Sequence, residues 1–547
     1  MQKLSYPETL VAVIAPLITY LIITFIRVRL SYHGRPKPPH SFLWGHLKVF
    51  KDIIGVFPPN THPQFFYTEL AKRYNLPGIW YLDLWPFGPA QVIITSAEAS
   101  FEVLSKRPYL MHRWVDYWFR IMLGPNVIAA INGPAWKKLH HMMGPSFSPV
   151  AVKAQVPVIA RHAALFHENL CKVIKTGKPF SMVDITSRAT SDIISDMVLG
   201  FSLKAQQNGS PLLQDFKTIF TLTQPYMDTW NPIRKAMLWW KIRGAKQRTD
   251  AYLHSVLDAR YQLFRENSAI PSRKSARSVL DRMVIQRIEE MGDSTPLRLD
   301  QPFIDLVTPN LKGLLAGGQS TTSDALCHTH LLLSLHPAIL TRLRKEHSSL
   351  FPPSLAETVS TITMNPALTS ASSLPYTTAI LQETLRLFPA GFTSREAPPD
   401  VTHLIFDGVS YPVQGKMIIP HQHALHYDEK QFPNPTEFLP ERFMPEYTGS
   451  KAHRFAWRPF ERGLRSCIGK ELAMEEMRIV LVCTVRWFDF EGIFEGVMSK
   501  GEGKVMFSDW DERIGESAWQ EMALGAAPRG GMMMRGVYRG EEGEGVR

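Results

Sequence analysis

A short glycine-bounded loop around Cys467 constrains the fold of this chain more than any other segment. It leads directly into an amphipathic stretch, residues 470–488. Glycine permits tight turns and close approach of the backbone, so Gly463 and Gly469 predict a compact loop around the thiol. The free N–H groups and partial positive charge of the following helix would stabilise a thiolate, and Arg465 adds positive charge nearby. A thiolate held in this way is a strong ligand for iron.

The number of cysteines also limits the class of protein. Four cysteines in 547 residues cannot form the dense disulfide framework of a small secreted domain. They indicate a reducing compartment, or one cysteine kept for chemistry. Cys171, Cys327 and Cys483 lie within helical patterns, where a buried and inert thiol is the ordinary expectation. Cys467 is therefore the candidate metal ligand.

The cysteine loop resembles the haem-ligand signature of the cytochrome P450 superfamily. That signature has Phe, Gly, Arg, Cys and Gly at fixed spacing, and this chain meets every position. The resemblance implies haem b as the cofactor, with Cys467 as the axial ligand of its iron. It also implies a mainly α-helical fold with a small β portion. The matching residues are Phe460, Gly463, Arg465, Cys467 and Gly469.

Two further charged segments occur in the order found in that family. Glu383 and Arg386 are three residues apart on a predicted helix, residues 376–388, and therefore share one face. Taken alone, such a pair is typical of a solvated surface. A Pro-Glu-Arg-Phe segment that contains Arg442 follows, ahead of the cysteine loop. The resemblance implies that the three charged residues form a buried structural network that locks the segment before this loop.

Three segments correspond to those whose residues bind the haem propionates in the family. Trp136 and His140 lie four residues apart on a predicted helix, where the family usually has Trp and Arg. A neutral imidazole still donates one hydrogen bond, so His140 remains a candidate. Arg395 is the next candidate, and Arg465 of the cysteine loop is the last. A solvated surface position is the alternative for each arginine.

The long predicted helix over residues 303–335 carries the residues expected on the oxygen side of the haem. The family usually has Ala or Gly, then Gly, any residue, Asp or Glu, and Thr. In one alignment Gln319 takes the acidic position and Ser320 the alcohol position. In the other, Ser320 takes the acidic position and Thr321 the alcohol position. We favour the second because it keeps the threonine and places the helix end at residues 336–337.

Both alignments leave the acidic position without a carboxyl group. Gly317 and Gly318 are expected to weaken the helix and leave room for dioxygen, and the Thr321 hydroxyl can bond the carbonyl four residues earlier. Neither Ser320 nor Gln319 can supply a proton as a carboxylic acid does. We therefore expect protons to arrive through water and hydroxyl groups. The same departure keeps open a haem-thiolate enzyme that does not activate dioxygen.

An uncharged and largely apolar run lies near the N-terminus, over residues 9–26. As a helix it would be ~27 Å long, close to the ~30 Å hydrocarbon core of a bilayer. Lys3 is the only basic residue before the run, whereas Arg27 and Arg29 follow it directly. The positive-inside rule therefore places the remaining chain in the cytosol. A cleaved signal peptide is the alternative, but its apolar stretch is usually shorter. We expect residues 1–30 to be a single-pass anchor in the endoplasmic reticulum membrane, with the catalytic domain cytosolic.

The rest of the chain is predicted to form one large domain. We expect a Pro-rich linker over residues 31–50, a haem-binding catalytic domain over 51–531 and a flexible C-terminal tail over 532–547. A β-hairpin is expected from residues 79–84 and 91–95, with further short strands in 407–419. The main predicted helices cover residues 97–106, 135–143, 156–174, 184–199, 303–335, 338–347, 376–388 and 470–488.

The charge balance and the resemblance together indicate the partners. A net charge of +11 favours an anionic partner without singling out nucleic acid. The resemblance implies a microsomal, fungal-type monooxygenase of secondary metabolism, which inserts one oxygen atom from O2 into a lipophilic small molecule. Electrons would come from NADPH through NADPH–cytochrome P450 reductase, with cytochrome b5 as a second candidate donor, and membrane lipid would be a further partner. Basic residues around the cysteine loop are expected to steer the acidic reductase: Arg454, Arg458, Arg462 and Lys470.

Two other functions remain open on the sequence. The first is a haem-thiolate isomerase or dehydratase that needs neither oxygen nor a reductase. The second is a non-catalytic, membrane-anchored haem protein. Strict dependence of activity on NADPH and oxygen separates the monooxygenase from the isomerase. A ferrous–CO spectrum without thiolate ligation would exclude both enzymes, so that the non-catalytic haem protein would remain.

Overall fold

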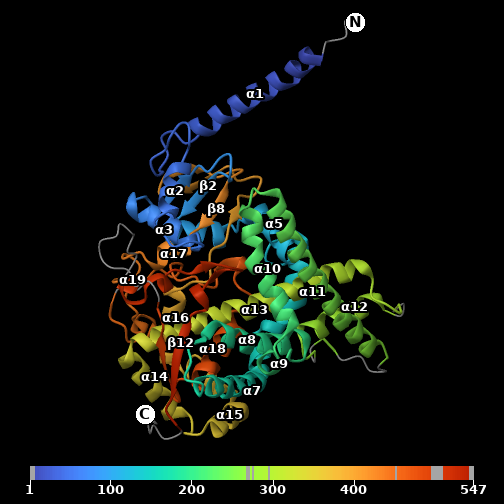
Figure 1. The fold of residues 1–547 in the computed structure, drawn as a ribbon, viewed down its shortest axis with the longest axis vertical. Coiled ribbons are helices and arrows are strands. Elements are labelled where there is room, and N and C mark those ends of the chain that lie inside the picture. Colours follow the sequence, from blue (N-terminus) through green and yellow to red (C-terminus); the bar gives the residue numbers. More distant parts are fainter. Residues whose placement is uncertain are drawn as a thin grey trace.

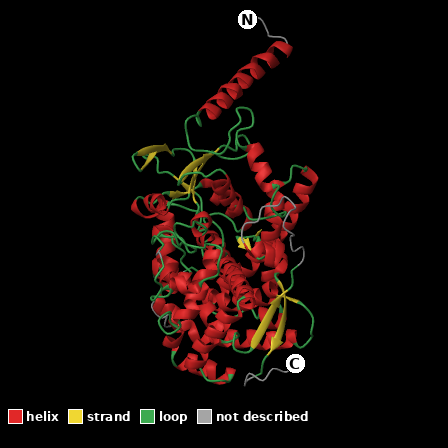
Figure 2. Cartoon of the chain, turned by 90° about the vertical axis from the view of Figure 1, so that its left-hand side faces the viewer, coloured by secondary structure: helices red, strands yellow, loops and turns green. Residues whose placement is uncertain are grey.

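A computed structural model describes the chain over residues 6–266, 272–273, 276–292, 296–449, 452–494 and 509–540. Helices predominate among these residues, and most strands lie near the base of the first helix or near the C-terminus, with a short strand pair between them (Figure 2). Helix α1 (Tyr6–Leu30) projects from one end of a single helical body (Figure 1). The expected mainly α fold with a small β portion is confirmed.

Helix α13 (Gln301–Leu335) crosses the middle of the body and organises it (Figure 1). The Asp300 side chain caps its first turn by accepting from the N–H of Phe303, and it ends before Pro337, which cannot continue a helix. Helix α8 (Met182–Leu199) packs along α13. Other helices that contact α13 include α11 (Pro232–Glu266), α16 (Pro375–Leu387) and α18 (Lys470–Val482).

The remaining helices surround this centre. They are α2 (Leu47–Ile54), α3 (Gln64–Arg73), α4 (Ala97–Phe101), α5 (Arg113–Met122), α6 (Gly133–Met143), α7 (Pro149–Ile174), α9 (Ala205–Asn208), α10 (Pro211–Asp228), α12 (Val279–Met291), α14 (Pro337–Leu350), α15 (Leu355–Met364), α17 (Gln422–His426) and α19 (Asp509–Ile514).

The largest sheet has five strands in the order β1-β2-β8-β5-β3. The predicted hairpin is present, with β1 and β2 antiparallel and Ile79 opposite Ile94, and β8 runs parallel to β2. Three smaller sheets pair β4 and β9 with β12, β6 with β7, and β10 with β11. The strands are β1 (Ile79–Leu82), β2 (Gln91–Ile94), β3 (Leu110–Met111), β4 (Phe180–Ser181), β5 (Arg395–Glu396), β6 (His403–Phe406), β7 (Val409–Pro412), β8 (Met417–Pro420), β9 (Phe488–Gly492), β10 (Glu521–Met522), β11 (Ala526–Ala527) and β12 (Met533–Tyr538).

The C-terminal boundaries differ from the sequence prediction. The helix expected over residues 470–488 ends at Val482, and Phe488 begins strand β9. That strand pairs with β12, where Tyr538 lies opposite Phe488. The prediction of a flexible tail over residues 532–547 is therefore wrong for its first part, because strand pairing holds residues 533–538. Residues 541–547 lie outside the described part of the chain.

The segment predicted as a linker packs against the body. Tyr32 is buried, and the carbonyl of Pro36 accepts a hydrogen bond from the N–H of Tyr81 in β1. Helix α2 already begins within the predicted linker, residues 31–50. At the end of α1, the Arg29 side chain is buried in an ion pair with Asp83. Among the described residues, no helix combines the length and the apolar character needed to cross a bilayer.

Candidate functional site

Cys467 lies just before α18 and faces a hollow inside the protein. Its backbone N–H donates to the carbonyl of Phe460 at 2.8 Å, which closes the loop. The side chain has accessible surface although protein surrounds it, and the resulting desolvation raises the pKa of the thiol. The N–H groups of Gly469 and Lys470 lower that pKa, as predicted for a helix start. Cys171 is half-buried, and the remaining two cysteines are buried, as expected for inert thiols.

The two glycines of the loop have different roles. Gly463 has φ +77, and a Cβ there would lie 2.1 Å from the carbonyl oxygen of Leu104. A tight turn and a close backbone approach therefore both require glycine at this position. Gly469 has φ −89, and a Cβ there would meet only the sulfur of Cys467, at 3.9 Å. The turn therefore does not require glycine at position 469. The absence of a side chain there leaves the sulfur of Cys467 uncovered.

Arg465 points away from the thiol. One of its Nη atoms donates to the carbonyl of Ile131 at 2.5 Å and to the side chain of Asn132 at 2.9 Å. Its guanidinium lies over the Trp136 ring, 4.3 Å from the ring centroid. Burial and the charge of Arg395 lower the pKa of Arg465 to about 10. The predicted effect of Arg465 on the Cys467 thiol is not found, since its charge is not among those that shift that pKa.

Two buried arginines flank one carboxylate beside the cysteine loop. Arg458 is 1% exposed and Arg395 is 2% exposed, and both approach Glu461, at 2.5 and 3.8 Å. Among the described residues, Nε of both arginines and one Nη of Arg458 are buried without a hydrogen-bond partner. Burial lowers the pKa of Arg395. One carboxylate therefore serves two buried cations, and the excess positive charge and unpaired N–H donors suit an additional anionic group. The prediction that Arg458 is a surface residue is wrong.

Trp136 and His140 lie together on α6, as expected. Trp136 is buried beneath Arg465, and its ring centroid is 4.8 Å from that of His140. His140 is exposed. The imidazole makes no hydrogen bond within the described residues, so it stays a candidate donor.

The candidate oxygen-side residues fall on two faces of α13. The Thr321 hydroxyl donates to the carbonyl of Gly317 at 2.8 Å, and the Ser320 hydroxyl donates to that of Ala316 at 2.9 Å. A Cβ at Gly317 would meet nothing within 4 Å among the described residues. At Gly318, however, it would lie 2.5 Å from the Ile194 side chain of α8. Gly317 thus faces open space as expected, whereas Gly318 allows α8 to pack closely.

A polar seam joins α13 to α8 on its opposite face. Thr186 of α8 bonds the Ser323 hydroxyl at 2.7 Å and the sulfur of Cys327 at 3.2 Å. Gln319 lies one turn before Ser323 and is buried on the same face. Its backbone carbonyl accepts a hydrogen bond from the Thr190 hydroxyl of α8 at 2.9 Å. This placement favours the alignment in which Thr321 is the alcohol.

A loop between α5 and α6 connects α13 with the cysteine loop. Asn310 of α13 donates to the carbonyl of Asn126 at 2.9 Å and accepts from the N–H of Ile128 at 2.8 Å. The carbonyl of Ile128 in turn accepts from Arg465 at 3.4 Å. The sequence analysis did not single out Asn310. A buried asparagine in an apolar helix is the signal that could have found it.

The charged network is assembled as the resemblance implied. Glu383 and Arg386 are both fully buried and form two hydrogen bonds, at 2.7 and 2.8 Å. Arg442 donates to the same carboxylate at 3.2 Å. Arg386 also donates to the carbonyls of His426 and Pro435, each at 2.7 Å. The network therefore fixes the path of the chain that leads to the cysteine loop.

Comparison with known proteins decides the family. The cytochrome P450 family model matches residues 36–505. The chain belongs to the cytochrome P450 family. A P450 monooxygenase of Aspergillus aculeatus, acrF, is 30% identical over 498 residues, which cover 87% of this chain and 97% of that protein. The monooxygenase polC of Polytolypa hystricis is 28% identical over 495 residues, covering 88% and 85%. This P450 is accordingly a monooxygenase by family.

A solved structure supports the fold of this P450. The haem domain of cytochrome P450DA superposes with a TM-score of 0.68 at 20% identity and covers 94% of this chain and 99% of that domain. The P450 family implies a haem cofactor, and the residues present fit it. Cys467 offers a thiol ligand in a hollow, and Arg395 and Arg458 offer unpaired N–H groups to anionic propionates. On α13, Gly317 borders open space among the described residues.

Proposed function

We propose that this P450 inserts one oxygen atom from O2 into a lipophilic small molecule of fungal secondary metabolism. Haem held by Cys467 would supply the oxygen-activating chemistry, because a thiolate ligand pushes electron density toward the iron. The carrying observation is a thiol that keeps accessible surface inside the protein, in a loop whose Glu461 pairs with two buried arginines that retain unpaired N–H groups. Arg395 and Arg458 would orient the cofactor through its propionates, with His140 as a third donor. Thr321 would hold a water molecule on the open side of α13.

The electrons are proposed to come from NADPH through a reductase, as P450 enzymes in general use a redox partner. Three cationic side chains near the cysteine loop are exposed and suit an acidic partner: Arg454, Arg462 and Lys470. Arg458 was expected to belong to this surface, but it is buried. The net charge of +11 would increase the rate of encounter at low salt.

The test of function uses the full-length enzyme in microsomes. We expect the ferrous–CO spectrum of a thiolate-ligated haem, and product formation that requires NADPH, reductase and oxygen. Oxygen-18 gas should label the product, while labelled water should not. Turnover without NADPH or oxygen would instead indicate the isomerase or dehydratase. A CO spectrum without the thiolate band would exclude both enzymatic functions. The non-catalytic haem protein would then be the remaining candidate.

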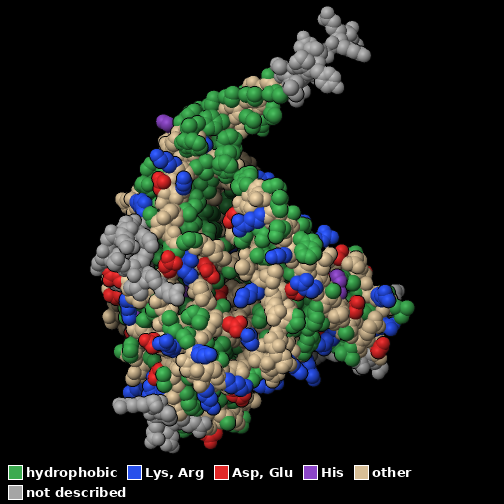
Figure 3. Space-filling model, viewed as in Figure 1, with side chains coloured by type: hydrophobic (Ala, Val, Ile, Leu, Met, Phe, Trp, Pro, Cys, Tyr) green, Lys and Arg blue, Asp and Glu red, His purple; other side chains and the backbone are tan. Residues whose placement is uncertain are grey.

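We also propose that α1 anchors this P450 in the endoplasmic reticulum membrane, with the catalytic domain cytosolic. Hydrophobic side chains cover the projecting helix and continue onto the adjoining body (Figure 3). Near its base, Phe42 and Trp44 are exposed, and Phe42 contacts the Phe25 ring of α1. Phe87 and Trp230 are also exposed, with ring centroids 6.2 Å apart. The described exposed apolar residues of α1 are Ile14, Leu17, Ile18, Tyr20, Leu21, Ile22, Ile23, Ile26 and Leu30.

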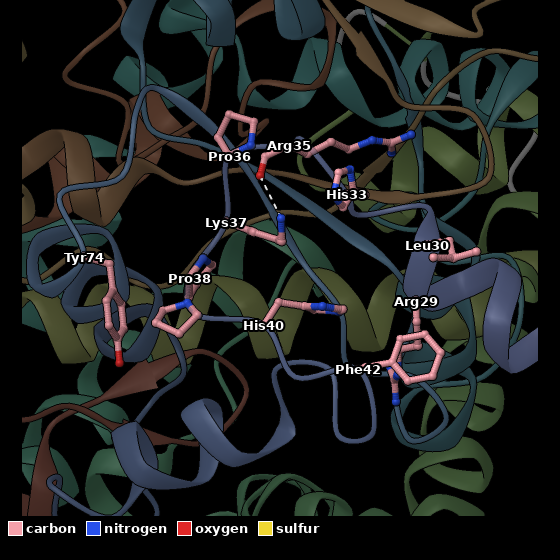
Figure 4. A pocket seen from close by; sticks show the side chains of 11 residues that line it. Arg29, Leu30, His33, Arg35, Pro36, Lys37, Pro38, His40, Phe42 and Tyr74 are labelled. Atoms are coloured by element: carbon pink, nitrogen blue, oxygen red, sulfur yellow. Dashed lines mark hydrogen bonds between the residues drawn. The ribbon is translucent and has the colours of Figure 1, made fainter.

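A cationic hollow at the base of α1 supports the same proposal. It has a volume of about 670 Å³, and Arg35, Lys37 and His33 contribute side chains to its lining (Figure 4). The Lys37 Nζ donates to the carbonyl of Arg35 at 3.2 Å. Burial and the charge of Arg35 lower the pKa of Lys37. Such like charges beside an apolar helix favour the negative headgroups of the cytosolic leaflet.

Membrane attachment is expected to depend on the apolar surface of α1. Replacing Ile18 and Ile22 together with arginine should release the protein from microsomes washed with alkaline carbonate, because each charge costs ~2.5–3.5 kcal/mol at the centre of a bilayer helix. Immunoblotting of pellet and supernatant measures the release. Val150→Arg, at an exposed apolar position in α7, is the control and should stay in the pellet. If the wild-type protein is released by the same wash as fully as the double variant, the proposed membrane anchor is contradicted.

A further inference from the structure

The open face of α13 carries an acidic residue that the family alignment does not use. Asp324 follows Thr321 by three residues and Gly317 by seven. With 3.6 residues per turn, Asp324 lies about 60° around the helix from Thr321, and Gly317 about 40° on the same side. The polar seam with α8 occupies the opposite face, at Gln319 and Ser323. Asp324 therefore shares the face of the threonine.

The Asp324 carboxyl group has no partner among the described residues. It keeps some accessible surface although protein surrounds it, as Cys467 does. By contrast, the buried Asp192 accepts hydrogen bonds from the N–H groups of Ala205 and Gln206. An unpaired carboxyl group in such a place is costly unless it keeps its proton. Desolvation raises its pKa well above the usual value, and the charge of Glu521 adds to this effect.

The residues at the usual acidic position cannot replace this group. The Ser320 hydroxyl is engaged with its own helix carbonyl, and Gln319, an amide that cannot act as an acid, is buried on the side of α13 that contacts α8. We propose that Asp324 supplies the proton-donating carboxyl group that this chain lacks at position 320. The proposal rests on the monooxygenase function, because insertion of one oxygen atom consumes two electrons and two protons and releases the second oxygen atom as water.

The relay moves one proton at a time and no electrons. The O–H bond of the Asp324 carboxyl group breaks as its proton passes to a water molecule between Asp324 and Thr321. Side chains three residues apart on a helix are about 5–6 Å apart at Cβ, a gap that one water can bridge. The Thr321 hydroxyl donates to Gly317, so its oxygen can accept a hydrogen bond from this water. The water then gives up a proton on the open side of α13.

Glu521 of β10 is placed to return the proton. Its charge acts on Asp324, and its partner strand β11 contacts α13. Glu521 is partly exposed, so it can exchange protons with solvent. Burial raises the pKa of Glu521, and the charge of Arg529 opposes the rise. On α13 itself, His328 bonds the Asp324 carbonyl, and burial lowers its pKa to about 4, so it is neutral at pH 7. Cys327 is directed to Thr186 of α8 and takes no part.

The relay is tested with Asp324→Asn in the reconstituted full-length enzyme. Product formed per NADPH is expected to fall by roughly 10²-fold or more, with the electrons diverted to reduced oxygen species. Asp324→Glu should retain most of the coupling. Asp305→Asn, at an exposed aspartate on the same helix, is the control and should match the wild type. Adding Ser320→Asp to Asp324→Asn should restore coupling.

Two measurements do not depend on turnover. Infrared difference spectra should show the carbonyl stretch of a protonated carboxyl group at neutral pH, and this band should vanish in Asp324→Asn. In wild type, the same band should decline as pH rises through the raised pKa of Asp324, and Glu521→Gln should shift that titration. An unchanged thiolate–CO spectrum of the variants shows that their haem site is intact.

Two results would overturn the relay while leaving the monooxygenase function standing. One is wild-type coupling in Asp324→Asn, and the other is an ionised Asp324 at neutral pH in the infrared spectrum. If the wild-type enzyme itself gives no oxygen-dependent product, the proposed function fails instead. The wild-type assay therefore separates failure of the relay from failure of the function.

Discussion

Replacing Arg386 with methionine is expected to destabilise this P450 by about 3–5 kcal/mol, because it leaves the buried Glu383 carboxylate without its main partner. The substitution also removes the hydrogen bonds from Arg386 to the carbonyls of His426 and Pro435. Both carbonyls belong to the chain that leads to the cysteine loop, so haem should be lost along with stability. The urea midpoint and the ratio of haem absorbance to protein measure the two effects.

Arg342→Met provides the matched control. Arg342 pairs with Glu441 at 2.7 Å, but both side chains are partly exposed, and such a pair contributes roughly 0–1 kcal/mol. The triple variant Glu383→Leu/Arg386→Met/Arg442→Met should recover part of the loss, because it removes all three charges of the network. If Arg386→Met is no worse than Arg342→Met, the network does not lock the segment before the cysteine loop.

Features set by residues close in the chain could be predicted from the sequence. The spacing of residues around Cys467 predicted that this cysteine lies just before a helix. The three-residue spacing of Glu383 and Arg386 predicted that both lie on one face of α16. Their burial could not be derived from that spacing, since an exposed pair has the same pattern. It followed only from the order of motifs in the family, in which Arg442 comes next.

Features set by distant residues could not be predicted. A basic residue near a loop is ordinarily exposed, but Arg458 is buried because Glu461 and His426 surround it. The role of Gly318 depends on Ile194, which α8 brings against it. The apolar pattern of residues 470–488 runs on without a break, and the end of the helix is set by pairing of β9 with β12. Each outcome required the tertiary fold.

Gly463→Ala is expected to have the second large effect, through the backbone of the cysteine loop. A non-glycine residue in the left-handed region costs roughly 1–2 kcal/mol. The added methyl group would also lie 2.1 Å from the carbonyl oxygen of Leu104 and 2.7 Å from the Ser105 hydroxyl. Because the first of these atoms is backbone, the loop itself must move, which adds roughly 1–3 kcal/mol of overpacking.

The expected result for Gly463→Ala is a lower urea midpoint and a smaller thiolate–CO band per mole of protein, because displacement of the loop moves Cys467. Gly469→Ala is the control on the other side of the same cysteine. Its φ of −89 suits alanine, and its methyl group would meet only the sulfur of Cys467, at 3.9 Å. It should keep the stability of the fold, and any loss should be confined to the CO band. Equal destabilisation by both variants would mean that the contact with Leu104 does not set the position of the loop.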